Sequence, residues 1–196
     1  MLSIFLQWLV YLLAAITVMR ALQMGFLYME DFRGKRLLAK ECRQNVPSEA
    51  VIILPGVDWR DPFAWVKANF HLDDIKTVLE FARGKGKPVS FYAGPSFGEV
   101  KDIMADKTVK EVYFVGHGGT DFFRLGTEEV LCYGIFNDPE KYGKEFVHQV
   151  HCGTLYGKSL IRCVVPEENR KKCFFHPGKI NSYFIEKEFS MLKGLI

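Results

Sequence analysis

The sequence has little of what marks several common classes of protein. It holds five cysteines and no C-x2-C pair, so neither a dense disulfide framework nor a paired-cysteine zinc site is expected. Lys and Arg exceed Asp and Glu by only three, too few to favour nucleic-acid binding. G-x-x-x-x-G-K-[ST] is absent, which argues against a phosphate loop. G-x-S-x-G occurs at residues 94–98, where Ser96 also has capping-box spacing with Glu99. With 48% hydrophobic and 25% charged residues, the chain is expected to form one ordered domain with reduced thiols.

The first 19 residues carry no charged side chain. As a helix they would reach about 28 Å, close to the roughly 30 Å hydrocarbon core of a bilayer. Apolar residues resume after Arg20, so residues 1–29 predict a transmembrane anchor helix, with Arg20 reaching to the interface. A buried core helix is the alternative. A cleaved secretory signal fits poorly, because no basic residue precedes the run.

Basic residues follow the apolar run and do not precede it. They are Arg20, Arg33, Lys35, Arg36, Lys40 and Arg43. This asymmetry predicts a single-pass protein with a short N-terminus outside and the rest in the cytoplasm, in agreement with reduced cysteines. Residues 30–49 predict a polar connector whose basic side chains could also rest on anionic lipid headgroups.

Short apolar runs alternate with helical patterns from residue 50 onward. Strands are predicted at residues 50–54, 88–93, 111–115, 146–151 and 172–175. Helices are predicted at residues 72–84, 97–104, 155–164 and 185–196, a hairpin at 121–133 and a short helix or loop at 139–144. Such alternation is typical of an α/β fold, a three-layer sandwich with a mostly parallel sheet, here over residues 50–196.

Two predicted strands end in residues that can do chemistry. The strand at 111–115 leads into Gly116-His117-Gly118, and the strand at 146–151 leads into Cys152-Gly153. Ligands bind beyond the carboxyl ends of strands in open α/β sheets. If these strands are parallel neighbours, His117 and Cys152 emerge at one edge, where the imidazole can activate the thiol. The glycines allow a close backbone approach and offer N–H groups to an oxyanion.

These two motifs resemble the caspase-like (clan CD) cysteine peptidases, which include caspases, metacaspases, legumains, gingipains, separases and CHAT-domain proteases. In that family an apolar strand ends in His-Gly, and a second ends in Cys, often with Gln shortly before and Gly after. Residues 112–118 match the first element and residues 146–153 the second. The resemblance implies a caspase-haemoglobinase-like fold, Cys152 as nucleophile and His117 as general acid/base. It also implies an oxyanion hole from the backbone amides of Gly118 and Cys152.

The resemblance further implies where a substrate would bind. Asp58 is a candidate counterpart of the family's charged specificity residue, which implies a basic P1 residue, and Gly116 and Gly153 would lie against the substrate. The expected function is therefore a membrane-anchored cysteine endopeptidase. It would act on protein or peptide substrates through a thioester, without cofactor or metal. A non-catalytic membrane-tethered interaction module and a Cys-dependent acyltransferase remain as alternatives.

The other histidines and cysteines have plainer interpretations. His148 and His151 lie three apart on one predicted strand, so they face opposite sides, with His148 on the face of Cys152. Both are interpreted as packing or supporting residues. A zinc site is the alternative for the remaining Cys/His residues, namely Cys163, Cys173 and His176, but their spacing contains no paired motif.

Overall fold

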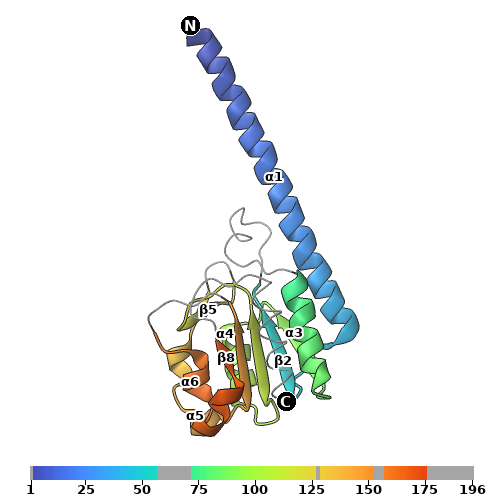
Figure 1. Cartoon of the computed structure of the whole chain (residues 1–196), viewed down its shortest axis with the longest axis vertical. Helices are drawn as coiled ribbons and strands as arrows, with labels where there is room; N and C mark the ends of the chain where they lie inside the picture. The colour runs from blue at the N-terminus through green and yellow to red at the C-terminus, as the bar shows by residue number, and fades with distance from the viewer. Residues whose placement is uncertain (1, 57–71, 127–128, 152–156, 176–196) are drawn as a thin grey trace.

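The structure is a computed structural model that describes residues 2–56, 72–126, 129–151 and 157–175. A long helix projects from an α/β domain, and its C-terminal turns lie along one side of that domain (Figure 1). This helix is α1 (Leu2–Glu41). Within the described residues it is the helix long and apolar enough to cross a membrane, with a mean hydropathy of 1.8 and no burial over its apolar window. The predicted N-terminal apolar helix is confirmed, as a candidate membrane span.

The helix continues past its predicted end. The connector predicted over residues 30–49 is corrected, because residues 30–41 are the last turns of α1 and β1 (Arg43–Gln44) joins the sheet. Leu38 is fully buried in a cluster with the helix α3 (Leu72–Gly84). Glu41 pairs with Arg83 of α3 at 2.7 Å. Contacts with the domain therefore keep this charged stretch helical.

Six strands form one parallel sheet in the order β1-β3-β2-β4-β7-β8. The strands after β1 are β2 (Ala50–Leu54), β3 (Val89–Ala93), β4 (Glu111–Val115), β7 (Phe146–Val150) and β8 (Phe174–Phe175). Every residue of β2, β4 and β7 is buried. The predicted parallel sheet is confirmed, because apolar runs without alternation suit strands covered on both faces.

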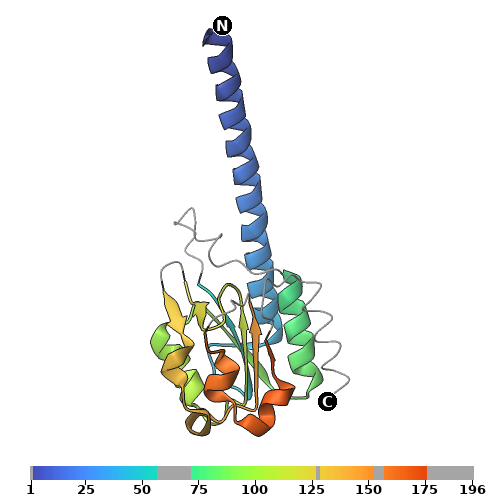
Figure 2. The same cartoon turned by 60° about the vertical axis from the view of Figure 1, so that its left-hand side comes forward.

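Helical layers cover both faces of this sheet (Figure 2). The end of α1 and α3 pack on one face. The other face carries α4 (Phe97–Ala105), α5 (Pro139–Tyr142) and α6 (Leu160–Val164), and the 3-10 helices η1 (Tyr133–Phe136) and η2 (Glu167–Lys172) complete the described elements. Ser96 and Glu99 form the predicted capping box of α4. The helix predicted at 185–196 lies outside the described residues.

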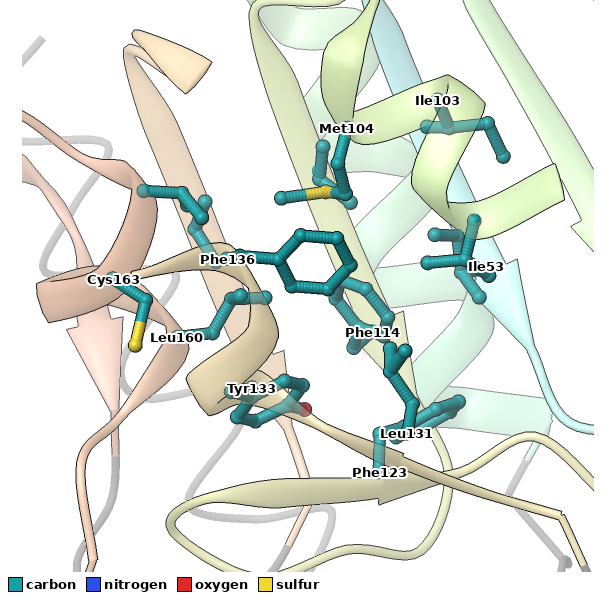
Figure 3. Packing of buried hydrophobic residues seen from close by; sticks show 14 of the residues in the cluster. Ile53, Ile103, Met104, Phe114, Phe123, Leu131, Tyr133, Phe136, Leu160 and Cys163 are labelled. Atoms are coloured by element: carbon teal, nitrogen blue, oxygen red, sulfur yellow. The ribbon is translucent and has the colours of Figure 1, made fainter. Parts of the chain in front are cut away.

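The predicted hairpin is confirmed and contributes to the core. Its strands are β5 (Phe122–Arg124) and β6 (Val130–Cys132), which pair antiparallel. Phe123 and Leu131 pack inward against Phe114 of β4 (Figure 3), with the rings of Phe114 and Phe123 5.1 Å apart. The hairpin therefore lies over the face of β4, close to where that strand ends.

Candidate active site

The carboxyl ends of β4 and β7 lie side by side. The two strands are parallel, and Val115 is paired with Val150 at their ends. Immediately beyond, the Gly116 amide donates to the Val150 carbonyl at 3.2 Å. The prediction that these two strands are parallel neighbours is confirmed. The connection from β2 runs to β3 on one side and the connection from β4 runs to β7 on the other, so the switch point, where α/β sheets bind ligands, lies between β2 and β4, next to this pair.

The loop after β4, residues 116–121, is called here the His117 loop. Close packing holds it in place at its glycines. A Cβ on Gly116 would lie 2.9 Å from Pro55 Cδ, just after β2. A Cβ on Gly118 would lie 2.5 Å from the Phe122 carbonyl oxygen and 2.7 Å from His151 Nδ1. Both glycines therefore allow close packing against the chain's own β2, β5 and β7 ends, while the expected approach of a substrate to Gly118 stays a prediction.

The imidazole of His117 is half-buried, and its backbone is fixed by the hairpin. Its carbonyl accepts from the Arg124 amide at 2.9 Å, and the Gly119 amide donates to the Phe122 carbonyl at 2.9 Å. These two hydrogen bonds form an antiparallel bridge between Gly118 and Phe123, which does not use the peptide N–H of Gly118. No other hydrogen bond within the described residues uses this N–H either. The peptide N–H of Gly118, the predicted oxyanion donor, therefore has no acceptor among the described residues.

His151, the residue before Cys152, is buried beneath the His117 loop. Its Nε2 lies 2.7 Å from the hydroxyl of Tyr133, and its ring lies 5.5 Å from that of Phe123. Burial raises the pKa of Tyr133 well above its ordinary value, so the hydroxyl stays protonated at neutral pH. These contacts fix the end of β7 where the chain enters the predicted nucleophile segment.

His148 faces the opposite side of the sheet from His151, as predicted. Its ring stacks on Phe146, with centroids 6.1 Å apart, and is fully buried. Burial lowers the pKa of His148 to about 3, so the imidazole is neutral at physiological pH. It is a packing residue, as expected.

Gly157, the first described residue after the predicted nucleophile segment, also packs against the His117 loop. Gly157 has a φ of +103°, and a Cβ there would lie 2.6 Å from Asp121 Cγ. This close approach requires glycine. The two described residues that flank positions 152–156, His151 and Gly157, therefore both pack against the His117 loop.

A buried glutamine links the loop to the start of α6. Gln149 of β7 is fully buried. Its Nε2 donates to the Thr120 carbonyl at 3.4 Å, and its Oε1 accepts from the Leu160 amide at 2.9 Å. The sequence motif before Cys152 includes this residue but does not predict its contacts. The signal for it in the sequence is an amide side chain, next to His148, within a strand expected to be buried.

The predicted site residues divide between described and undescribed parts of the chain. The structure describes His117, Gly118 and Gly116 and joins them to the end of β7. Cys152, Gly153 and Asp58 lie outside the described residues. The structure thus brings together the two strand ends and both flanks of the nucleophile segment.

The described members of the zinc alternative, Cys163 and Cys173, lie in separate surroundings. Cys163 is buried in the core beside α5, while Cys173 accepts from the Val147 amide at 3.4 Å. His176 lies outside the described residues, and within them no group of three His, Cys, Asp or Glu side chains is placed to hold a metal. Burial raises the pKa of Cys173 to about 11. The four described cysteines are free thiols.

No protein-family model, no curated protein and no solved structure matches the chain.

Proposed function

We propose that this chain is a membrane-anchored cysteine endopeptidase in which Cys152 is the nucleophile and His117 the general acid/base. The observation that carries the proposal is the packing of both flanks of segment 152–156 against the His117 loop. His151 lies beneath Gly118, and Gly157 lies against Asp121. Because Cys152 directly follows His151 in the sequence, we expect its thiol at the same edge of the sheet as the imidazole of His117.

The proposed reaction is acyl transfer through a thioester. His117 takes the proton of the Cys152 thiol as the sulfur attacks the peptide carbonyl, and it then gives that proton to the leaving amine. Water, activated by the same imidazole, attacks the thioester, and the released thiol regains its proton. The carbonyl oxygen becomes negative in each tetrahedral intermediate and would accept from the amides of Gly118 and Cys152.

The surroundings of His117 support this role. Catalysis by fixed donors requires a backbone that does not rearrange during the reaction. The loop is held by the hairpin through Arg124, by Pro55 after β2 and by His151 after β7. The peptide N–H of Gly118, the residue after His117, has no acceptor within the described residues. Because the loop is held in place, we expect this donor to keep its position during the reaction.

The proposed substrate is a protein or peptide with a basic P1 residue, which Asp58 would bind. The domain lies on the cytoplasmic side, since the basic residues follow the apolar run. A substrate would therefore be a cytoplasmic protein or the cytoplasmic part of a membrane protein.

Hydrolysis of a fluorogenic peptide panel by the detergent-solubilised full chain tests the proposal. We expect cleavage after Lys or Arg, and a loss of at least about a thousandfold in Cys152→Ala and in His117→Ala. Cys132→Ala is the matched control, because it removes an exposed thiol from β6 and should leave the rate unchanged. Acyl transfer from thioester donors with no peptide cleavage would instead identify an acyltransferase. Function that survives Cys152→Ala would identify a non-catalytic module.

A further inference from the structure

A hollow of about 240 Å³ lies between the last turns of α1 and the outer edge of the sheet. Phe91 and Ala93 of β3 and Phe32 of α1 supply its apolar walls, and Lys35, Arg36 and Gln44 supply its polar groups. It exists because β1 is only two residues long and pairs with Ser90 and Phe91. The sheet edge beyond that pairing faces α1 across the hollow.

The charged groups of the hollow are cationic. Lys35 donates to Asp31 at 2.9 Å, one turn earlier on α1. Arg36 is exposed, and no carboxylate of the described residues lies within ion-pair distance of it. A guanidinium offers paired N–H donors in the geometry that a phosphate accepts. The hollow therefore combines an apolar wall with a cation suited to a phosphate.

The hollow lies on the continuation of the candidate membrane span. Exposed apolar and aromatic side chains extend along α1 as far as Phe26, Tyr28, Met29 and Phe32, and the basic residues follow. Aromatic and then basic residues are typical of the membrane–water interface. Arg36 is seven positions beyond Met29, about 10 Å along the helix. Helical side chains lean toward the N-terminus, which here is the membrane side, so Arg36 is directed back toward the headgroups.

We infer that this hollow binds an anionic glycerophospholipid of the membrane that α1 crosses. The phosphate would accept from Arg36 and Lys35, and the glycerol and upper acyl chain would lie against Phe32 and Phe91. An apolar wall continuous with a membrane helix favours a lipid over a free anion. Such a lipid would hold the domain at a fixed height and rotation above the bilayer. The inference is independent of the peptidase proposal.

Retention of phosphatidylglycerol by the full chain tests the inference. The protein is reconstituted in nanodiscs of phosphatidylcholine with phosphatidylglycerol, released into mild detergent, and the bound lipid is counted by native mass spectrometry. We expect Arg36→Gln to lower the retained phosphatidylglycerol at least fivefold. Arg33→Gln is the matched control, because it removes the same charge from an exposed neighbouring position that does not line the hollow. It should lower retention less than twofold.

Each other result overturns the inference. Equal losses in the two variants would mean diffuse attraction to a charged surface and no site. Equal retention of phosphatidylcholine and phosphatidylglycerol by the wild-type chain would show that the phosphate charge is not recognised. Complete displacement of the lipid by millimolar inorganic phosphate would identify a site for free anions.

Discussion

At the scale of single residues, His148 links stability to pH. Burial holds its pKa at about 3 in the folded chain, against about 6.5 in an unfolded one. The unfolded state therefore binds the extra proton first as the pH falls. The contribution of His148 to the free energy of unfolding is complete above about pH 6.5 and falls by about 1.4 kcal/mol per pH unit below it, until about pH 3.

Denaturation of the detergent-solubilised chain at pH 7, 6 and 5 checks this dependence. Carboxylates also weaken with acid, so the informative quantity is the difference between wild type and His148→Leu. We expect the wild type to lose more stability than the variant between pH 6.5 and 5. Parallel pH profiles would contradict the assignment.

Lys144 is a second buried residue with a distinct role. Its ammonium donates to the carbonyls of Ile103, Asp106 and Val109, at 3.2, 2.8 and 2.8 Å, where α4 ends. Burial lowers its pKa to about 8. Lys144→Met would leave these acceptors without a donor and should lower the free energy of unfolding by about 3 kcal/mol. Chemical denaturation measures this change in the free energy of unfolding, and Lys107→Met, at an exposed position, is the control. An equal change in the two variants would contradict a special role for the buried ammonium.

At the scale of elements, Gln149 links the His117 loop to α6. Gln149→Leu removes both of its hydrogen bonds and leaves the Leu160 amide unpaired, which should cost about 1–3 kcal/mol. Under the proposed function it should also lower kcat more than it raises KM, because the loop positions His117. Gln149→Glu keeps the acceptor for Leu160 and loses the donor to Thr120, but it also buries a carboxyl group, so its loss of stability should be at least as large. A kcat unchanged in both variants would contradict a positioning role.

Much of the element pattern could be predicted from sequence, because local patterns determine it. Strands β2, β4 and β7 are buried runs of mostly apolar residues, and Ser96 with Glu99 identifies the start of α4. The end of α1 could not be predicted in this way. Its last turns are rich in charge, and burial of Leu38 against α3, a tertiary contact, keeps them helical.

The same distinction between local patterns and tertiary contacts applies to the candidate site. The two strand ends could be identified because each reactive motif directly follows a buried run. The hydrogen bond between Tyr133 and His151 joins η1 to the end of β7, and it depends on where the hairpin packs. No local pattern encodes such a contact.

At the scale of the whole molecule, α1 connects a candidate membrane span to the α/β domain without a break. The basic residues beyond the span predict that the domain is cytoplasmic. Cys132 is an exposed thiol of that domain and reports its side. We expect a membrane-impermeant maleimide to leave Cys132 unmodified in intact cells and to modify it after lysis. Modification in intact cells would reverse the orientation.

The central claim is that His117 activates Cys152, and alkylation of the full chain by iodoacetamide tests it most directly. Cys132 serves as the internal reference for an ordinary exposed thiol. We predict that at pH 7 Cys152 reacts at least about tenfold faster than Cys132, because a neighbouring imidazole favours the thiolate. In His117→Ala this advantage should disappear while Cys132 reacts as before. Equal rates at the two cysteines, unchanged by His117→Ala, would contradict the account.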